Sequence, residues 1–378
     1  MIARIQDTNI RQWLDKRKAV IVTGARQVGK TTLVRQITQS LNRKTIWFTG
    51  DDPEARSLLD QISLARLQTL IGQHEVVVVD EAQRFTNAGL MLKLITDHLP
   101  QVQLLVTGSS SLDIASQTKE SLTGRKFEFS LFPISFKEMC DHHGYLAERS
   151  LLEHRMIYGY YPEVVSSEPH TAQKILADLA DGLMYKDLLT LDQIKKPTLL
   201  VKLLQALALQ LGSEVIYNEV AQLIGADPLT VEKYTDLLEQ SFVLFRLPSL
   251  SRNARNEIKK GRKIYFYDNG IRNALLKNFS PLALRNDTGA LWENFLLAER
   301  KKRNTYSDYF CNTFFWRTTA QQEIDYVEEA GGVLHAFEFK WQPKKSLRFP
   351  QAFLNAYPGS LTELVDRDNF DAFVGLND

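Results

Sequence analysis

The stretch VTGARQVGKTTL, residues 22–33, sets the fold class of the N-terminal part of the chain. From Gly24 to Thr31 it fits the pattern G-x-x-x-x-G-K-T, directly after a β-branched run and at the start of a helix-like segment. The two glycines let the backbone curl with its amides inward, and the helix N-terminus adds its dipole. Lys30 can then reach the outer phosphates of a nucleotide while Thr31 ligates magnesium. The predicted phosphate-binding residues are Gly24, Ala25, Arg26, Gln27, Val28, Gly29, Lys30, Thr31 and Thr32.

A second motif, VVVVDEAQ (76–83), places two acids at the end of an apolar run about fifty residues after Lys30. Asp80 is predicted to hold the magnesium through water. Glu81 is predicted to orient or deprotonate the attacking water, because phosphoryl transfer depends mostly on positioning and charge neutralisation. The alternative is a valine-rich strand that ends in solvated acids, and the first motif favours the catalytic interpretation.

The first third of the chain alternates short β-branched runs with helix-like stretches such as KTTLVRQITQSL and GLMLKLITDHL. Continuous apolar strands of this kind predict an α/β fold, a parallel sheet with helices on both faces. The runs are AVIVTG (19–24), TIWFT (45–49), VVVVDE (76–81) and LLVTG (104–108). From about residue 133 to 240 the pattern is mostly helical, and short aromatic strands then surround one helical segment, ALWENFLLAERKK.

Composition excludes several classes of protein. With 378 residues, 44% hydrophobic and 24% charged, the chain is long enough for two or three domains with real cores and is not disordered. Its two cysteines suit a reducing compartment. The N-terminal segment lacks the apolar core of a signal peptide, and no apolar run approaches a membrane span. We therefore expect a cytoplasmic protein with no membrane partner.

Two weaker signals lie in the same N-terminal region. The run TGSSS places Thr107, Ser109 and Ser110 at the end of a predicted strand, where they either sense the γ-phosphate or form a plain polar turn. Further on, SLTGRKFEF puts Arg125 after a glycine at an exposed corner. This arginine either stabilises the transition state in a neighbouring subunit or is an ordinary surface residue.

The middle of the chain has a helix-turn-helix pattern, NEVAQLIGADPLTVEKYTDLLEQSFVLFRLP. We predict a turn from Gly225 to Pro228 and a second helix begun by Thr230. Its exposed start is not convincingly basic, so a winged helix that only packs stays as plausible as a DNA reader. The basic stretches 251–263 and ERKKRN (299–304) favour nucleic-acid contact, against the alternative of solvated lysines that guard a strand edge.

The C-terminal region contains AFEFKW (336–341), in which Glu338 and Lys340 share one face of an extended segment. Asp325 lies on EIDYV, one hairpin earlier, and Glu293 lies on the preceding helix ALWENF. Nucleases of the restriction-endonuclease type need carboxylates around divalent metal and a lysine near the attacking water. The four residues appear in the order that such a site requires, and the alternative is the charged face of an ordinary strand.

Taken together, VTGARQVGKTTL, VVVVDEAQ, LLVTGSSS, SLTGRKFEFSLFPISFKE and YGYYPEVV resemble a family of bacterial and archaeal AAA-superfamily ATPases. The C-terminal half of this family is known as domain of unknown function 4143, and the resemblance covers the whole chain. It implies a C-terminal domain similar to the restriction-endonuclease fold, with Glu293, Asp325, Glu338 and Lys340 on the matching positions. One departure, DEAQRFTN, puts in doubt the shape of the turn after Glu81 but not the magnesium site.

These features and the resemblance predict four domains: a P-loop AAA-type ATPase core (1–132), a helical lid (133–197), a winged helix-turn-helix (198–250) and a restriction-endonuclease-like α/β domain (251–378). We expect a magnesium-dependent ATPase that forms a homo-oligomer and couples ATP to engagement of nucleic acid, with DNA favoured. In this scheme Lys30, Glu81 and Arg125 are catalytic, and Thr31 and Asp80 hold Mg2+. The alternative is a nucleotide-switched signalling or scaffold ATPase whose C-terminal half binds a protein and cuts nothing.

Overall fold

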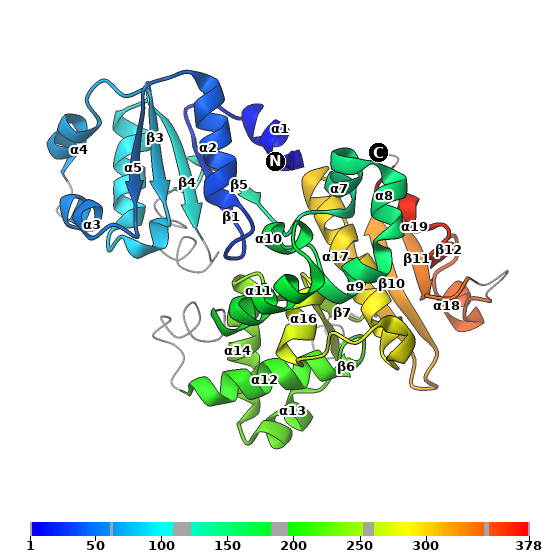
Figure 1. Cartoon of the computed structure of the whole chain (residues 1–378). Coiled ribbons are helices and arrows are strands. Elements are labelled where there is room, and N and C mark those ends of the chain that lie inside the picture. Colours follow the sequence, from blue (N-terminus) through cyan, green and yellow to red (C-terminus); the bar gives the residue numbers. More distant parts are fainter. Residues whose placement is uncertain are drawn as a thin grey trace. The chain divides into compact units, whose positions relative to one another are not determined.

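The computed structural model describes residues 2–60, 63–108, 122–182, 196–251, 261–343 and 348–376. The chain forms two compact units (Figure 1). The first comprises Met1–Ile134 with Gln240–Phe242, and the second comprises Ser135–Glu239 with Val243–Asp378. Along the described part of the chain, no helix combines the length and the apolar character that a membrane crossing needs.

A five-stranded parallel sheet forms the centre of the first unit, with strand order β2-β3-β4-β1-β5. The strands are β1 (Ala19–Thr23), β2 (Thr45–Thr49), β3 (Val76–Asp80), β4 (Gln103–Gly108) and β5 (Lys126–Ser130). The helices are α1 (Ile5–Arg11), α2 (Lys30–Leu41), α3 (Pro53–Asp60), α4 (Leu64–Ile71) and α5 (Ala88–His98), with the 3-10 turn η1 (Ala82–Arg84). The predicted parallel sheet is therefore confirmed, and β5 is a strand that the sequence analysis did not predict.

Burial explains why the inner strands form continuous apolar runs. Every residue of β1 and β3 is buried, because helices cover both faces of the sheet. On one face Val77 and Val79 of β3 pack in one cluster with apolar side chains of α4 and α5, while α2 contacts β4. Because the strands are parallel, the residues that follow them all lie at the carboxyl edge of the sheet, where a binding site can form.

The second unit contains two sheets and most of the helices. Its three-stranded antiparallel sheet has the order β6-β8-β7, and its four-stranded sheet has the order β12-β11-β10-β9. Strands β9, β10 and β11 are antiparallel, and β12 is parallel to β11. The strands are β6 (Glu214–Val215), β7 (Leu244–Pro248), β8 (Arg262–Phe266), β9 (Asn312–Arg317), β10 (Glu323–Ala330), β11 (Val333–Lys340) and β12 (Leu361–Asp366).

Helix α17 (Thr288–Tyr306) contacts both β8 and β11, so it joins the two sheets of this unit. The other helices are α7 (Phe136–His143), α8 (Tyr145–Ser150), α9 (Leu152–Tyr158), α10 (Pro162–Val165), α11 (Pro169–Gly182), α12 (Pro197–Leu209), α13 (Tyr217–Ile224), α14 (Pro228–Gln240), α16 (Asn269–Leu275), η3 (Leu282–Leu284), α18 (Gln351–Ala356) and α19 (Phe370–Phe373). The segments predicted as lid, winged helix and nuclease-like domain thus lie in one compact unit, and the four-domain division stays a prediction.

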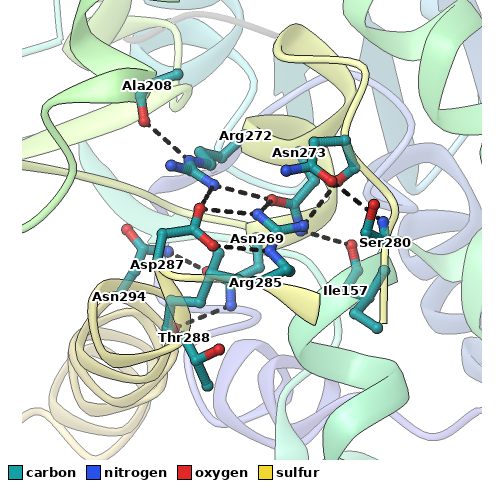
Figure 2. Close-up of polar contacts among 12 residues, drawn as sticks. Ile157, Ala208, Asn269, Arg272, Asn273, Ser280, Arg285, Asp287, Thr288 and Asn294 are labelled. Carbon is teal, nitrogen blue, oxygen red and sulfur yellow. Dashed lines mark hydrogen bonds and ion pairs between the residues drawn. The ribbon is translucent and has the colours of Figure 1, made fainter. Parts of the chain in front are cut away.

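A buried polar network, shown in Figure 2, ties α9, α12, α16 and the start of α17 together. Arg272 donates to the Ala208 carbonyl at 2.9 Å and to Asp287 Oδ2 at 2.6 Å. Arg285 donates to Asp287 Oδ1 at 2.8 Å, and Asn273 Nδ2 donates to the Ile157 carbonyl at 2.8 Å. Burial opposes the ionisation of Asp287, but the hydrogen bonds from the two arginines outweigh it and lower its pKa to about 2.

Candidate nucleotide-binding site and C-terminal acidic cluster

The predicted phosphate-binding loop runs from the end of β1 to the start of α2, and its backbone conformation depends on glycine. Gly29 has φ 99° and precedes the first residue of α2, while Gly24 has φ 155°. A Cβ on Gly24 would lie 2.1 Å from the Leu131 carbonyl oxygen, so no other residue fits there without a shift of the backbone. The loop therefore has the curled form that the motif predicted.

Lys30 lies inside this loop and is only 4% exposed. Its ammonium donates to the carbonyl oxygens of Gly24 at 3.0 Å and Ala25 at 2.9 Å. The first turn of α2 contains no acidic residue, so its free amides face no competing negative charge from that turn. The arrangement suits a phosphate group at the N-terminus of α2.

The residues predicted to hold magnesium meet at the carboxyl edge of the sheet. Thr31 Oγ1 donates to Asp80 Oδ1 at 2.9 Å, which brings the first turn of α2 against the end of β3. Hydroxyl and carboxylate oxygens are the hard donors that Mg2+ prefers, usually together with water and phosphate oxygens. Thr31 and Asp80 therefore fit this ion, which would neutralise phosphate charge when bound.

Thr107, at the end of β4, connects the two acids. Its hydroxyl is completely buried, donates to Asp80 Oδ1 at 2.5 Å and accepts the Glu81 backbone N–H at 3.0 Å. Glu81 has φ 51°, a left-handed conformation that is uncommon outside glycine. Gln83 Nε2 donates to Glu81 Oε2 at 2.6 Å. Thr107 thus orients the Asp80 carboxylate and the Glu81 backbone, and Gln83 orients the Glu81 carboxylate. Ser109 and Ser110 lie outside the described residues.

Arg4 is a contact of the loop that the sequence analysis missed. From the start of the chain, it donates to the Val28 carbonyl at 2.8 Å and to the Phe132 carbonyl at 2.7 Å. It thereby links the phosphate-binding loop to the segment that follows β5. No local motif marks Arg4, because its partners are distant in sequence.

Arg125 lies near the amino ends of the strands, whereas the phosphate-binding loop of the same chain lies at their carboxyl ends. Ala19, the first residue of β1, pairs in parallel with Lys126, the first of β5, so Arg125 precedes the amino end of the sheet. Five residues of β1 separate this edge from the loop, which is roughly 16 Å of strand. The side chain is 40% exposed and pairs with Asp97 at 2.5 Å. Arg125 is therefore remote from Lys30 within one chain.

In the second unit, Glu338, Asp325 and Lys340 come together as predicted from alternation along the strands. Lys340 Nζ lies 3.0 Å from Glu338 Oε2 and 3.8 Å from Asp325 Oδ2. The Phe339 backbone N–H donates to Asp325 Oδ2 at 2.8 Å. Burial raises the pKa of Glu338 to about 7, with Asp325 adding to the rise and Lys340 opposing it.

Glu293 is held chiefly by a lysine that the sequence analysis missed. Lys263 of β8, only 1% exposed, lies 3.1 Å from Glu293 Oε1 and 2.5 Å from Glu323 Oε1. The Tyr265 hydroxyl also donates to Glu293 Oε1, at 2.5 Å. Burial raises the pKa of Glu293 to about 7, against the opposing charge of Lys263. Asp325 is close enough to add to this rise.

No three acidic, histidine or cysteine side chains among the described residues are arranged to hold a metal ion. The nearest positive charges to these carboxylates are those of Lys263 and Lys340. As arranged, the cluster is therefore partly neutralised by lysine and does not present a metal position. We call Glu293, Glu323, Asp325 and Glu338 the acidic cluster.

The predicted helix-turn-helix segment forms α13 and α14, joined by a turn in which Gly225 has φ 73°. The second helix begins at Pro228, two residues earlier than predicted. Asp227 accounts for the difference, because its carboxylate accepts the Thr230 backbone N–H at 2.8 Å and the Thr230 hydroxyl at 2.6 Å. The hydroxyl of Thr230 is thus used within the first turn.

The predicted basic cluster ERKKRN does not form a basic surface. Arg300 is buried and pairs with Glu328 at 2.6 Å, and Lys302 is buried and pairs with Glu299 at 2.6 Å. Helix α17 turns these two cations inward toward internal carboxylates, which the sequence pattern did not reveal. Residues 252–260 of the other basic stretch lie outside the described residues.

Family models place this geometry in a known class. An AAA domain matches residues 16–140, which contain the sheet, the loop and both acids. Two domains of unknown function follow, DUF8612 over residues 149–282 and DUF4143 over residues 288–369. The N-terminal unit is thus an AAA-type P-loop domain.

The chain thus combines an N-terminal AAA domain with a C-terminal DUF4143 domain, as the resemblance predicted. An uncharacterized protein of Mycobacterium tuberculosis is 26% identical over 335 residues, which cover 88% of this chain and 72% of that protein. An uncharacterized protein of Methanocaldococcus jannaschii is 21% identical over 86% of this chain and 75% of its own length.

Solved structures give only distant matches. A DNA replication initiation factor has 13% identity and a TM-score of 0.25, over 62% of this chain and 86% of its own. The Pif1 helicase from Candida albicans has 14% identity and a TM-score of 0.26, over 48% of each chain. Scores this low add nothing to the assignment, which rests on the family models and the observed sheet.

Proposed function

We propose that the protein is a magnesium-dependent ATPase in which Lys30 binds the outer phosphates, Thr31 and Asp80 hold the ion, and Glu81 positions the attacking water. The observation that carries this proposal is the chain of hydrogen bonds from Thr31 through Asp80 and Thr107 to Glu81. It joins three neighbouring elements at the edge where the phosphate-binding loop begins. Magnesium supplies charge neutralisation when bound, and the protein supplies orientation.

The same proposal includes assembly of the chain with itself. Arg125 lies at the edge of the sheet away from its own loop and keeps 40% of its side chain exposed. A guanidinium in that place serves a phosphate only when the phosphate belongs to another subunit. The proposal therefore assigns Arg125 to the transition state of a neighbouring copy, after it exchanges Asp97 for phosphate.

We also propose that the nucleotide state controls engagement of nucleic acid, DNA above all, by the C-terminal half. Support comes from the helix-turn-helix pair α13 and α14 and from the basic composition of residues 251–263. The test is fluorescence anisotropy with single- and double-stranded DNA and RNA, with ATP, with ADP and without nucleotide, at two salt concentrations. Binding that weakens with salt and changes with nucleotide supports the proposal.

A matched variant separates this idea from its alternative. Lys30→Ala should abolish the nucleotide dependence and leave nucleotide-free binding unchanged, because Lys30 belongs to the phosphate-binding site of the first unit and not to the C-terminal half. Absence of salt-sensitive binding to all four nucleic acids would instead favour a signalling or scaffold ATPase whose C-terminal half binds a protein.

Cleavage of nucleic acid is a second candidate function, favoured by the convergence of Glu338, Asp325 and Lys340 on one strand pair. The assay incubates nucleic acid with the protein, ATP and either magnesium or manganese. If the site cuts, Lys340→Ala prepared identically is inert, while its ATP hydrolysis is intact. If Lys340 only balances charge, the wild type cuts nothing and Lys340→Ala lowers the free energy of unfolding, because it leaves the buried carboxylates of Glu338 and Asp325 without that counter-charge.

A further inference from the structure

A cavity of about 820 Å³ lies in the second unit, apart from the acidic cluster and from the nucleotide site. Its walls come from β7, from the C-terminal half of α17 with the loop that follows, and from the turn between β10 and β11. The volume is that of a site for a small organic molecule. The aromatic side chains that line it are Phe245, Tyr309, Phe310 and Tyr326.

Lys301 is a cation of this cavity that forms no ion pair with a carboxylate among the described residues. Lys301 lines the wall, and its ammonium lies 5.1 Å from the centre of the Phe245 ring and 6.0 Å from that of Tyr267. Its neighbours Arg300 and Lys302 both have carboxylate partners. In the described part of the chain, no carboxylate forms an ion pair with Lys301. Glu239 is near enough to act on this ammonium, but among the described residues it forms no ion pair with it, and the direct contacts of the ammonium are with aromatic rings. A half-buried ammonium in such a place is a position that an anion would stabilise.

The other charged groups of the cavity indicate how many negative charges it can accept. Arg246 donates to Glu239 Oε2 at 2.6 Å and pairs with Asp236 at 2.6 Å, so its charge is already balanced. Asp308 and Glu329 also line the cavity and repel further negative charge. Lys301 offers a ligand one positive charge, and the two carboxylates on the same wall repel a chain of phosphates more than they repel a monoanion.

The outer wall indicates what the rest of the ligand is like. Phe310 is 89% exposed and Tyr309 is 39% exposed, although both rings border the cavity. A bound molecule with a flat apolar body would cover these rings and remove their apolar surface from water. On the same wall, the Asn304 amide donates to Glu328 Oε1 and the Thr305 hydroxyl donates to the Lys301 carbonyl, so both groups are already used within the protein. The Thr313 hydroxyl also lines the cavity and can contact polar atoms of the ligand.

We propose that this cavity binds a small aromatic monoanion, a carboxylate or sulfonate, with its charge on Lys301 and its rings against Phe245, Tyr309 and Phe310. Such a site lies outside the ATPase machinery and does not depend on it. The ligand would act as a second small-molecule partner of the C-terminal half.

The test uses two fluorescent dyes that differ in a single charge. The anionic probe is 8-anilinonaphthalene-1-sulfonate, and the neutral probe is N-phenyl-1-naphthylamine, which has the same rings without the sulfonate. Lys301→Met should lower the affinity for the anionic dye by about tenfold, which is the size of one charge-assisted contact. Its affinity for the neutral dye should stay within about twofold of wild type. Lys174→Met removes an exposed lysine of α11 and should change neither dye.

Circular dichroism would show whether Lys301→Met folds. If it does not, two further variants still test the proposal. Lys301→Arg keeps the charge and should bind the anionic dye within about threefold of wild type, and Thr313→Trp fills the wall and should weaken both dyes. Equal affinity of Lys301→Met and wild type for the anionic dye would overturn the proposal. So would displacement of that dye by a single-stranded oligonucleotide, because the site would then accept a polyanion.

Discussion

Replacement of Thr107 by valine removes one hydroxyl from the centre of the proposed ATPase site and keeps the shape of the side chain. The hydroxyl donates to the Asp80 carboxylate and accepts the Glu81 backbone N–H, so its loss leaves both groups without that partner. A hydrogen bond to a charged group contributes about 1.5–3 kcal/mol. If this bond acts mainly in the transition state, ATP turnover falls by roughly 10- to 150-fold.

Nucleotide affinity should change far less than turnover in Thr107→Val, because the loop that holds the phosphates is not altered. Steady-state phosphate release gives turnover, and titration with a fluorescent ATP analogue gives affinity. Thr107→Ser restores the hydroxyl and should recover most of the rate. Thr49→Val is the matched control, since Thr49 pairs with Asp80 in the sheet register and its hydroxyl accepts the Asp51 backbone N–H.

If Thr107→Val hydrolysed ATP within about twofold of wild type, Thr107 would not orient the acids for hydrolysis. A fall of affinity and turnover by the same factor would also contradict this role, because Thr107 would then support the loop and not the acids. Thermal unfolding of each variant separates these outcomes from a loss of folded protein.

Three other experiments test separate parts of the structure. Asp287→Asn leaves two buried arginines without a counter-charge and should lower the free energy of unfolding, measured by urea titration, by about 3 kcal/mol at pH 7. Asp141→Asn, which breaks an exposed ion pair, should lower it by only about 0.5 kcal/mol. Because the pKa of Asp287 is lowered to about 2, its contribution is complete above about pH 4, and the difference between Asp287→Asn and wild type should shrink as the pH falls toward 2. Arg125→Ala subunits mixed with Lys30→Ala subunits should regain hydrolysis that neither has alone, and a mixture as inactive as its components would speak against action between subunits. Gly24→Ala should weaken nucleotide binding at least about tenfold in a titration, because its methyl group would lie 2.1 Å from a carbonyl oxygen; unchanged affinity would mean that the loop shifts at little cost.

The inner strands were predictable because helices cover both of their faces, so each forms an uninterrupted apolar run in the sequence. Strand β5, KFEFS, lies at the edge of the sheet with no residue fully buried, and its mixed pattern gave no such signal. The helix start at Pro228 depended on a side chain, Asp227, that bonds to the backbone three residues later. Local sequence thus sufficed for the core strands and for the edge strand β2, whose run TIWFT is β-branched and aromatic, but not for β5 or for the cap at Asp227.

The candidate sites divide in the same way. Lys30 and Thr31 begin α2 and Asp80 ends β3, so spacing along the chain was enough to predict that Thr31 and Asp80 lie close together. Lys263 meets Glu293 across 30 residues and two elements, and no spacing rule connects them. The inward pairing of Arg300 with Glu328 likewise depends on where α17 packs, which the run of basic residues did not reveal.

The most direct test of the ATPase assignment compares binding and hydrolysis of ATP in the same preparations of wild type, Lys30→Ala, Glu81→Gln and Lys44→Ala, which removes an exposed lysine outside the loop. The account predicts that Lys30→Ala loses both binding and turnover, and that Lys44→Ala behaves as wild type. Glu81→Gln should bind ATP with near-normal affinity and release phosphate at least about a hundredfold more slowly, because Glu81 positions the water and not the phosphates. Equal turnover in wild type and Glu81→Gln would contradict the account.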